Sequence, residues 1–540
     1  MPEKISIMNP REKQVYTWFL VVVLVLFCLA TYISRFNPLE VLWEQGEFWK
    51  FLFQDFLPPR FNASPVVVES ILVTFALAVS SSFVAAVFAF LFAVFGSTSL
   101  SPWKGLARTI RGFATFLRNI PTLVWAFILF SSLGIGTGVG FIALLISTFA
   151  FMTRAFIEVI DEVSCDAMEG LTACGGTFWQ KVCQGIVPTC LTQFIAWFLY
   201  CIELNIRAST IVGMVGGGGI GLVLFSYIKS FNYAGAAGII LVIAAMVIMV
   251  EFLTNYLRRK VLHKMEQTFV QARVQCLEFS NGRIRVARSG QDSELRWFLA
   301  AVTVVSIVAL YYLQLDWLKL ISRLPDLGKT FGLLALLDFH DFGLTLEAFS
   351  QTVAITVLAT IYSVLLGLVL AAFGARNLMK NKFVTYALSA FFTFLRAVPT
   401  PVWVLLALVC LGLGPAAGIV GLCVHATAFF ARAFTQSFED VPEEVIEALE
   451  ATGASKLHIF LSAILPAAAS QIMAWTGLRF EINFSESAIL GMIGAGGIGF
   501  AIANNIQGYQ FGAAGLAIVL VFVFAYCVEL VFTTIKKNYI

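Results

Sequence analysis

Long apolar runs separated by short polar segments make up most of this chain. A membrane-spanning helix needs about 20 apolar residues, and about twelve of the runs reach that length. The runs predicted as spans lie near residues 15–33, 66–95, 112–133, 138–158, 189–212 and 236–257, and then near 297–314, 346–374, 385–411, 416–436, 467–490 and 513–534. The pattern therefore predicts an all-α membrane protein.

The composition supports a membrane protein and excludes several other classes. Of the 540 residues, 59% are hydrophobic and 12% are charged, whereas about 25% of a soluble protein is charged. The net charge of +3 is too small to indicate a nucleic-acid partner. The ten cysteines show no C-x-x-C spacing and the four histidines are scattered singly. We therefore expect no metal site, no disulfide framework and no cofactor.

Lysine and arginine gather on one side of the predicted spans. Most of the 35 basic residues fall in segments that are cytoplasmic if the N-terminus is inside, including Arg258-Arg259-Lys260 and Lys536-Lys537. Cytoplasmic loops carry the excess of Lys and Arg in membrane proteins. We therefore expect a multi-pass protein of the cell (inner or cytoplasmic) membrane with both termini in the cytoplasm.

The chain is a tandem repeat with an offset of 278 residues. The segment Arg118–Thr122 corresponds to Arg396–Thr400, and more than half of the positions in Glu203–Gly221 are identical to those in Glu481–Gly499. Each half has an even number of spans, so the two halves share one orientation and a pseudo-two-fold axis along the membrane normal. The predicted domains are residues 1–261 and 297–540, with six spans each, joined by a polar cytoplasmic linker at 262–296. A docking role for the linker is the alternative to a simple tether.

Two cytoplasmic loops differ from the rest of the chain. Each is predicted as a short amphipathic helix, a glycine turn and a second helix that ends near a proline. The residues that mark these loops are Glu169, Gly175 and Pro188 in the first, and Glu447, Ala448, Gly453 and Pro466 in the second. A short helix on a glycine turn suits a rigid contact with a soluble partner. The alternative is a helix that lies on the lipid surface.

A dense glycine run follows the fifth span of each half. The run includes Gly213, Gly216 and Gly218 in the first half, and Gly491, Gly494 and Gly496 in the second. Glycine costs about 1 kcal/mol per residue relative to alanine inside a helix. The run therefore predicts a gate or a re-entrant turn that lines a cavity. Close packing of two helices through small residues is the other interpretation.

Polar and ionisable residues near the ends of the fifth spans are the candidates for the translocation path. They are Glu203, Asn205 and Arg207 in one half, and Arg479, Glu481, Asn483 and Glu486 in the other. Ionisable groups are costly in lipid and should face a partner or a cavity. The arginine fork suits a phosphonate or phosphate oxyanion. The alternative is ion pairing alone, of Arg207 with Glu203 or Glu486 and of Arg479 with Glu481.

These motifs together resemble those of a known family. The pattern E-A-x-x-x-x-G of the second loop, the series Arg479-Phe480-Glu481-x-Asn483 with the following glycines, and Asp55–Pro59 are similar to the phosphonate-type permeases of ATP-binding-cassette (ABC) importers. The first loop departs from that pattern, with Gly170 in place of the usual alanine. The resemblance implies the type I importer fold, two units in one chain, and loops that act as coupling helices. It also implies two ATPase subunits and an extracytoplasmic binding protein as partners.

We therefore expect the membrane-spanning permease subunit of an ABC importer, with phosphonate, phosphite or phosphate as the substrate class implied by the resemblance. The chain has no nucleotide-hydrolysis motif of its own, so ATP hydrolysis belongs to a separate subunit. The rival interpretations are a type I importer for an amino acid or another small solute, and an ion-coupled secondary transporter that would use Glu203 and Glu481 as ion sites. A membrane-embedded enzyme would need a catalytic constellation that the sequence does not show.

Overall fold

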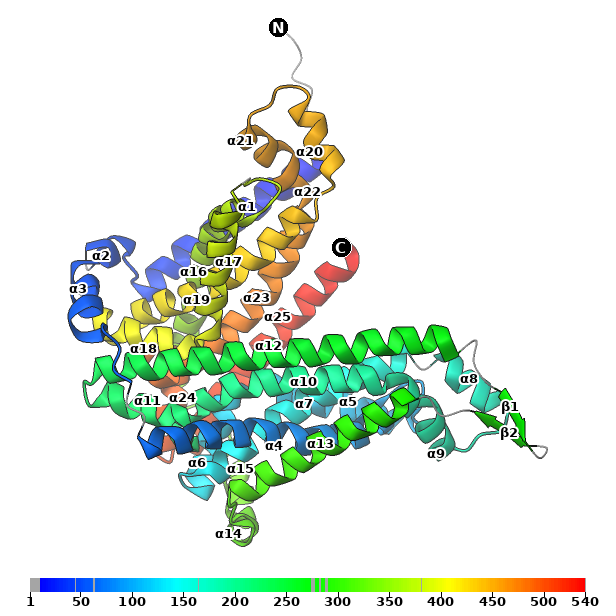
Figure 1. Cartoon of the computed structure of the whole chain (residues 1–540). Helices are drawn as coiled ribbons and strands as arrows, with labels where there is room; N and C mark the ends of the chain where they lie inside the picture. The colour runs from blue at the N-terminus through cyan, green and yellow to red at the C-terminus, as the bar shows by residue number, and fades with distance from the viewer. Residues whose placement is uncertain are drawn as a thin grey trace. The chain divides into compact units, whose positions relative to one another are not determined.

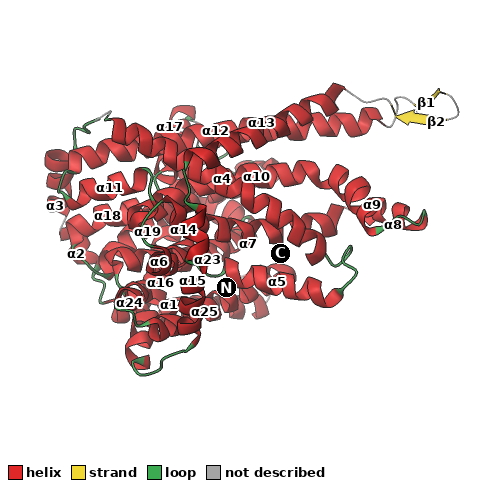
Figure 2. Ribbon diagram, turned by 90° about the horizontal axis from the view of Figure 1, so that it is seen from below, coloured by secondary structure: helices red, strands yellow, loops and turns green. Residues whose placement is uncertain are grey.

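The computed structural model describes residues 10–43, 45–61, 64–163, 165–272, 277–280, 283–286, 290–379 and 381–539. Nearly all of these residues are helical (Figure 2). The chain divides into two compact units, which we call the central unit (Asp55–Gly332) and the C-terminal unit (Met1–Gln54 with Leu333–Ile540). The predicted all-α membrane fold is confirmed.

Helices of the central unit form a bundle with one small hairpin. The elements are α4 (Pro65–Gly96), α5 (Lys104–Arg118), α6 (Thr122–Leu133), α7 (Thr137–Val163), α8 (Cys165–Ala173), α9 (Phe178–Gln180), the π-helical turn η2 (Lys181–Ile186), α10 (Val187–Val212), the π-helical turn η3 (Gly213–Gly217), α11 (Ile220–Lys229), α12 (Tyr233–Ala272), β1 (Leu277–Ser280), β2 (Arg283–Val286), α13 (Gly290–Tyr312) and α14 (Trp317–Ser322).

The C-terminal unit repeats the series α4–α12 of the central unit in its own elements α16–α25. Its elements are α1 (Pro10–Ser34), α2 (Pro38–Trp43), α3 (Gln45–Lys50), α16 (Phe342–Gly374), α17 (Lys382–Ala397), α18 (Thr400–Leu411), α19 (Pro415–Glu439), α20 (Glu443–Glu450), α21 (Lys456–Ile459), the π-helical turn η4 (Phe460–Ile464), α22 (Leu465–Ala467), α23 (Ala469–Leu490), the π-helical turn η5 (Gly491–Ala495), α24 (Gly497–Gln507) and α25 (Phe511–Tyr539). The π-helical turn η1 (Phe51–Phe56) and α15 (Leu324–Ala335) connect the two units along the chain.

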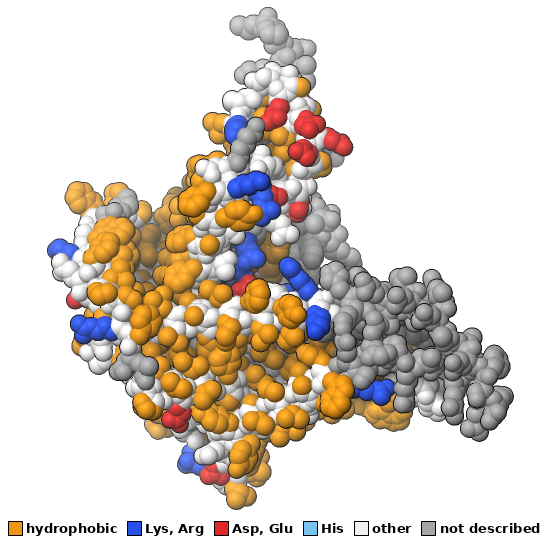
Figure 3. Space-filling view, in the orientation of Figure 1, with side chains coloured by type: hydrophobic (Ala, Val, Ile, Leu, Met, Phe, Trp, Pro, Cys, Tyr) orange, Lys and Arg blue, Asp and Glu red, His pale blue; other side chains and the backbone are white. Residues whose placement is uncertain are grey.

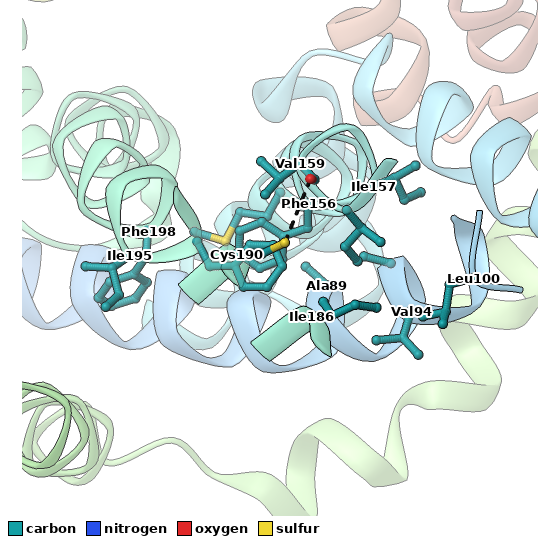
Figure 4. Close-up of a cluster of buried hydrophobic side chains, with 14 of the residues drawn as sticks. Ala89, Val94, Leu100, Phe156, Ile157, Val159, Ile186, Cys190, Ile195 and Phe198 are labelled. Atoms are coloured by element: carbon teal, nitrogen blue, oxygen red, sulfur yellow. Dashed lines mark hydrogen bonds between the residues drawn. The ribbon is translucent and has the colours of Figure 1, made fainter. Parts of the chain in front are cut away.

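The core of the central unit lies between α4, α7 and α10 (Figure 4). Ala85, Ala89 and Ala93 recur at intervals of one helical turn on α4 and are fully buried. Small residues let helix backbones approach closely, which is how helices pack where lipid supplies no hydrophobic driving force. Cys190 of α10 fills the centre of this cluster, with its sulfur 3.9 Å from the backbone oxygen of Val159.

Aromatic side chains fill the equivalent core of the C-terminal unit. Phe430, Phe434 and Phe438 follow one face of α19 and are fully buried. Gly367 of α16 makes room for Phe430, because a Cβ atom at Gly367 would lie 2.6 Å from the Cβ of Phe430. The two units therefore share a helix arrangement but fill it with different side chains.

Each unit takes its first helix from the other half of the sequence. Helix α1 packs on α16, where the rings of Phe27 and Phe36 meet the ring of Tyr362 with centroid distances of 5.9 Å in both cases. Helix α13 packs on α4, where Phe298 and Leu299 contact the central core. The compact units therefore do not coincide with the predicted domains 1–261 and 297–540, which describe the repeat in the sequence. The connections after α1 and α13, each roughly 30 residues long, can span up to about 100 Å and so permit this exchange.

Two of the predicted spans are not single helices. The segments predicted at 112–133 and 385–411 are broken, with bends of 86° between α5 and α6 and 87° between α17 and α18. Pro121 and Pro399 lie at the two breaks, and a proline disfavours the helical conformation of the residue before it. Within the described residues, seven helices are long and apolar enough to cross a membrane, or up to ten if each bent pair is one span.

The predicted linker at 262–296 is described only in part. Helix α12 continues to Ala272 before it ends. Strand β1 then pairs with β2 in an antiparallel hairpin, with Glu278 opposite Arg285. The tether role of this segment, with a docking surface as the alternative, stays a prediction.

A carboxylate at the end of α7 ties three elements of the central unit together. Asp161 accepts hydrogen bonds from the hydroxyls of Ser97 and Ser99, both at 2.6 Å, and from the backbone N–H of Thr98 at 3.1 Å. It also pairs with Arg111 of α5. The repeat places Glu439 at the same position in the C-terminal unit, where it accepts a hydrogen bond of 3.0 Å from the backbone N–H of Arg376. In both units an acid therefore holds a loop against the last turn of a helix: the loop after α4 against α7, and the loop after α16 against α19.

Replacing Asp161 by alanine is expected to lower the stability of the purified protein. The change removes several hydrogen bonds to one charged group, and a bond of this kind contributes about 1.5–3 kcal/mol. The apparent Tm in detergent should fall by several degrees. Glu158→Ala is the matched control on the same helix, because Glu158 is 60% exposed and pairs only at the surface with Arg154. Equal melting of the two variants would contradict a structural role for Asp161.

Candidate functional site

Short helices α8 and α20 end in glycine turns at the predicted positions. Gly175 has φ +73° and Gly453 has φ +79°. The N–H of Gly453 donates to the oxygen of Glu450 at 2.9 Å, and the next N–H reaches back to Leu449 at 3.3 Å. A Cβ atom at either glycine would meet nothing within 4 Å. The backbone conformation, and not a lack of space, therefore requires glycine here.

One face of each short helix is anchored and the other is open. Ile446 of α20 is buried against Ile459 and Ile464, and Met168 of α8 is buried in the central core. The acidic side chains of α20 are exposed and form the red patch over α20 in Figure 3; they are Glu443, Glu444, Glu447 and Glu450. Glu169 of α8 is exposed as well. In Figure 1, α20 and α21 extend beyond the ends of α16, α19 and α23. Each segment thus presents exposed acidic side chains on a buried base.

The prolines of these segments do not end the second helix as predicted. Pro188 lies in the first turn of α10 and Pro466 in the first turn of α22. A π-helical turn, η2 or η4, precedes each proline. The helix continues through this π-helical turn, whose wider hydrogen bonding accommodates a proline that has no N–H to donate. The second helix of each segment therefore continues toward the fifth span, with a bend of 65° after Ala467 in the C-terminal unit.

The glycine runs interrupt the helix between the fifth span and the short helix that follows it. Gly216 and Gly494 have φ +107° and +124° inside η3 and η5. Gly218 and Gly496 also have positive φ. A Cβ atom at Gly213 would lie 2.4 Å from the oxygen of Gly218, and one at Gly491 would lie 2.4 Å from the oxygen of Gly496. The run is thus a tight turn in which backbone packs directly on backbone.

Threonines that the sequence analysis did not single out hold these turns. Thr74 of α4 accepts a hydrogen bond of 2.8 Å from the N–H of Ile220, and Thr352 of α16 accepts one of 2.8 Å from the N–H of Ile498. Each hydroxyl caps an N–H at the start of α11 or α24 that no helical carbonyl can reach. The two threonines are 278 positions apart, so the repeat offset was the signal that could have identified them.

Buried asparagines stand in the middle of both fifth spans. Asn205 donates to Ser82 and to Thr148, both at 2.8 Å, and accepts from the Thr148 hydroxyl at 3.0 Å. Asn483 donates to Thr360 at 2.9 Å, but its amide oxygen has no hydrogen-bond partner among the described residues. The position of Thr148 is occupied by Ala426 in the second half. The two asparagines therefore hold helices together, and their networks differ.

The charged residues of the central unit pair within the bundle. Arg207 donates to Glu203 at 2.6 Å, one helical turn earlier on α10. A second carboxylate, Glu251 of α12, lies 3.9 Å from the same guanidinium. These side chains are between 12% and 19% exposed. Glu203 is one of the partners that the sequence predicts for Arg207, whereas Glu251 is not among them.

A second buried cluster surrounds Arg479 of the C-terminal unit. Its Nη2 atom lies 2.9 Å from Glu486 and 3.0 Å from the Nδ1 atom of His425. Thr400 donates to the same carboxylate oxygen of Glu486 at 3.2 Å, and the ring of Phe429 lies 5.4 Å from the guanidinium carbon. Glu486 follows Arg479 by seven positions, or two helical turns, and shares its face of α23.

Glu481, which the sequence analysis offered as the partner of Arg479, is half-buried on the same helix. Two positions along a helix correspond to a rotation of about 200°, so the two side chains leave α23 on different sides. His425, Thr400 and Phe429 were not predicted. A histidine inside an apolar span and the threonine after the Pro399 break are the signals that could have identified them.

Two blocks of the sequence match one known protein family. Residues 85–263 and 363–538 match the family described as "Binding-protein-dependent transport system inner membrane component". This chain belongs to that family. The two matched blocks contain the glycine turns, the fifth spans and the helix–glycine–helix segments of both units.

Relatives of this transport family include permeases with named substrates. A phosphate-import permease of Mycolicibacterium smegmatis is 28% identical over 88% of this chain and 86% of its own length. A phosphite transport system permease of Stutzerimonas stutzeri is 30% identical over 42% of this chain and 83% of its own length. An inward-facing structure of the MetNI methionine ABC transporter is 24% identical over 34% of this chain and 91% of that chain, with a TM-score of 0.30.

Proposed function

We propose that this chain is the membrane-spanning subunit of an ABC importer for phosphonate-type oxyanions, with both permease units in one polypeptide. The two family matches in one chain carry this proposal. The substrate class rests on the relatives that import phosphate and phosphite. Two arginines inside the bundles, Arg207 and Arg479, supply cationic groups that suit such oxyanions.

The coupling partners are two ATPase subunits on the cytoplasmic side. Helices α8 and α20 are anchored by Met168 and Ile446 and end in glycine turns, so they can transmit a push as rigid bodies. ATPase closure would draw the two segments together and convert the permease from an inward-facing to an outward-facing state. Hydrolysis would then restore the inward-facing state.

Substrate arrives from an extracytoplasmic binding protein at the opposite face. The glycine turns at Gly213–Gly218 and Gly491–Gly496 form the gate in this proposal, because a backbone turn at the end of a span can reorganise with little side-chain movement. In this proposal the charged residues Glu203, Arg207, Arg479, Glu481 and Glu486 lie along the path that follows, and Asn205 and Asn483 hold the fifth spans to their neighbouring helices beside it. Both termini lie in the cytoplasm in this arrangement, as the distribution of Lys and Arg indicates.

Uptake by the reconstituted complex tests this function. The chain, its ATPase and its binding protein in proteoliposomes should import labelled methylphosphonate, phosphite or phosphate only when ATP is present. Methionine and glycine betaine serve as competing solutes. Transport driven by an ion gradient without ATP would favour a secondary transporter, and import of methionine or glycine betaine in place of the oxyanions would leave the fold but reject the substrate class.

A further inference from the structure

The N-terminus of α18 is a second feature of the Arg479 cluster. The break after Ala397 starts a new helix of 12 residues at Thr400, turned by 87° from α17. The first N–H groups of a helix have no helical acceptor and carry partial positive charge. Anions bind at such helix starts for this reason. In α18 itself Pro401 has no N–H, and the N–H of Val402 donates to the oxygen of Pro399 at 3.0 Å. The break therefore places the Thr400 hydroxyl and the positive end of the helix dipole inside the bundle, without a row of free N–H groups.

A carboxylate of the protein is bound to the side chain of Thr400, the first residue of α18. Glu486 accepts from the Thr400 hydroxyl at 3.2 Å and from Arg479 at 2.9 Å. His425 presents its Nδ1 atom to the same guanidinium at 3.0 Å. Arginine can only donate, so Nδ1 is the acceptor and the N–H of a neutral His425 is on Nε2. In this structure the Arg479 guanidinium and the Thr400 hydroxyl thus bind one anion, the carboxylate of Glu486.

The cation of this site is more deeply buried than the anion. The Arg479 side chain is 3% exposed and the Glu486 side chain is 24% exposed. The Nε atom of Arg479 is buried and has no hydrogen-bond partner within the described part of the chain. The Nε–H group of Arg479 therefore has no acceptor among the described residues when Glu486 is bound. An oxyanion with several oxygens can accept from more donors of a guanidinium than the single oxygen contact observed here.

The central unit provides an internal comparison. Its α6 also starts after a break, at Thr122, with a bend of 86°. Thr122 there accepts a hydrogen bond of 2.8 Å from the hydroxyl of Ser147. The repeat places Cys201, Ser147 and Ala208 where the C-terminal unit has Arg479, His425 and Glu486. All three ionisable residues of the cluster are therefore confined to one unit, although the broken helix is common to both.

We propose that Thr400 and Arg479 form the oxyanion site of the permease, with His425 orienting the Arg479 guanidinium, and that Glu486 is a built-in competitor which the phosphonate or phosphate group of the substrate displaces. The inference rests on the proposed function and adds where the substrate anion binds. Glu486 keeps Arg479 neutralised while the site is empty, so the buried cation never stands alone. When the substrate leaves, the carboxylate returns and promotes release.

Binding of inorganic phosphate by the purified complex in nanodiscs tests the competition. Glu486→Gln keeps the shape and the acceptor for Thr400 but removes the charge, so phosphate should bind at least tenfold more tightly than to the wild-type complex. Glu486→Asp keeps the charge but withdraws it by one methylene, so its affinity should lie between the two. Unchanged or weaker phosphate binding by both variants would overturn the proposal.

Matched variants separate this effect from general electrostatics and from folding. Glu347→Gln removes an exposed carboxylate of α16 in the same unit and should leave the affinity unchanged. The double variant Arg479→Gln/Glu486→Gln removes both the arginine and the carboxylate of this cluster and should bind phosphate no better than the wild type. If Glu486→Gln fails to fold, Glu486→Asp carries the decision. Tight binding by the double variant would overturn the role of Arg479.

The source of the anion is tested in the same assay. Nanodiscs with and without phosphatidylglycerol distinguish free phosphate from a lipid headgroup as the occupant, and suppression of phosphate binding by this lipid would overturn the assignment to substrate. Uptake of labelled oxyanion by the wild-type complex tests the proposed function independently. Normal uptake with an unaffected Glu486→Gln affinity would leave the function standing and reject only this site.

Discussion

The variant Gly453→Val is expected to stop uptake while the protein still inserts into the membrane. Gly453 has φ +79°, a conformation that costs an L-residue about 1–2 kcal/mol and more for a β-branched side chain. The turn after α20 would rebuild with another backbone, and the acidic face of α20 would lose its orientation. Because the site is open and exposed, the bundle itself should be unaffected. Uptake should fall by roughly tenfold or more, with the amount of protein in the membrane unchanged.

Asparagine at the same position is the matched control. Asparagine adopts the left-handed conformation more readily than other L-residues, so Gly453→Asn should retain most of the uptake. Binding-protein-stimulated ATPase activity should be measured beside uptake, because a coupling defect changes the ratio of the two. A Gly453→Val complex that imports at the wild-type rate would reject the coupling role of this segment.

Loss of either buried arginine is the second large effect that we expect. Arg479→Ala and Arg207→Ala should each lower uptake by roughly tenfold or more, and by more than they lower the amount of inserted protein. Removing one partner of a buried ion pair costs about 3–5 kcal/mol, because the other charge is left uncompensated. Arg479 is almost fully buried and Arg207 is 19% exposed, so the effect on protein amount should be larger for Arg479.

Lysine variants of the two buried arginines and an alanine variant of an exposed arginine are the controls for this experiment. Lysine keeps the charge but lacks the planar fork, so Arg207→Lys and Arg479→Lys should retain intermediate uptake. Arg376→Ala is the control, because the Arg376 side chain is 72% exposed. Uptake should be measured per inserted protein. Wild-type uptake by both alanine variants would remove these residues from the translocation path.

The glycine-rich segments show how far local sequence reasoning reaches. A dense glycine run cannot be favoured as a helix, and the structure does contain a break at Gly213–Gly218 and at Gly491–Gly496. Composition alone could not show that Thr74 and Thr352 cap the helices that follow these turns. Such a contact joins residues 146 positions apart, and its existence depends on how α4 and α16 pack.

The ion-pair partners of the two arginines show the same difference between contacts that local spacing predicts and contacts that depend on helix packing. Glu203 lies one helical turn before Arg207, so spacing along one helix was enough to propose that pair. Arg479 has carboxylates on its own helix at several spacings, and its surroundings include Thr400 and His425 from two other helices. Choosing among these partners requires the distances between helices, which hydropathy does not contain.

The sequence by itself determined the apolar spans, the repeat of two units, the glycine turns and the family to which the chain belongs. These properties depend on residue type and on short spacings, since burial in lipid and helix geometry act locally. The tertiary structure decided that the first helices are exchanged between the halves, that two spans break at Pro121 and Pro399, and that Glu486 meets Arg479 at the start of α18. Those outcomes depend on which helix surfaces pack best against segments that are distant in the sequence. Burial in lipid does not select among them, because an apolar helix is equally well buried at several positions in the bundle.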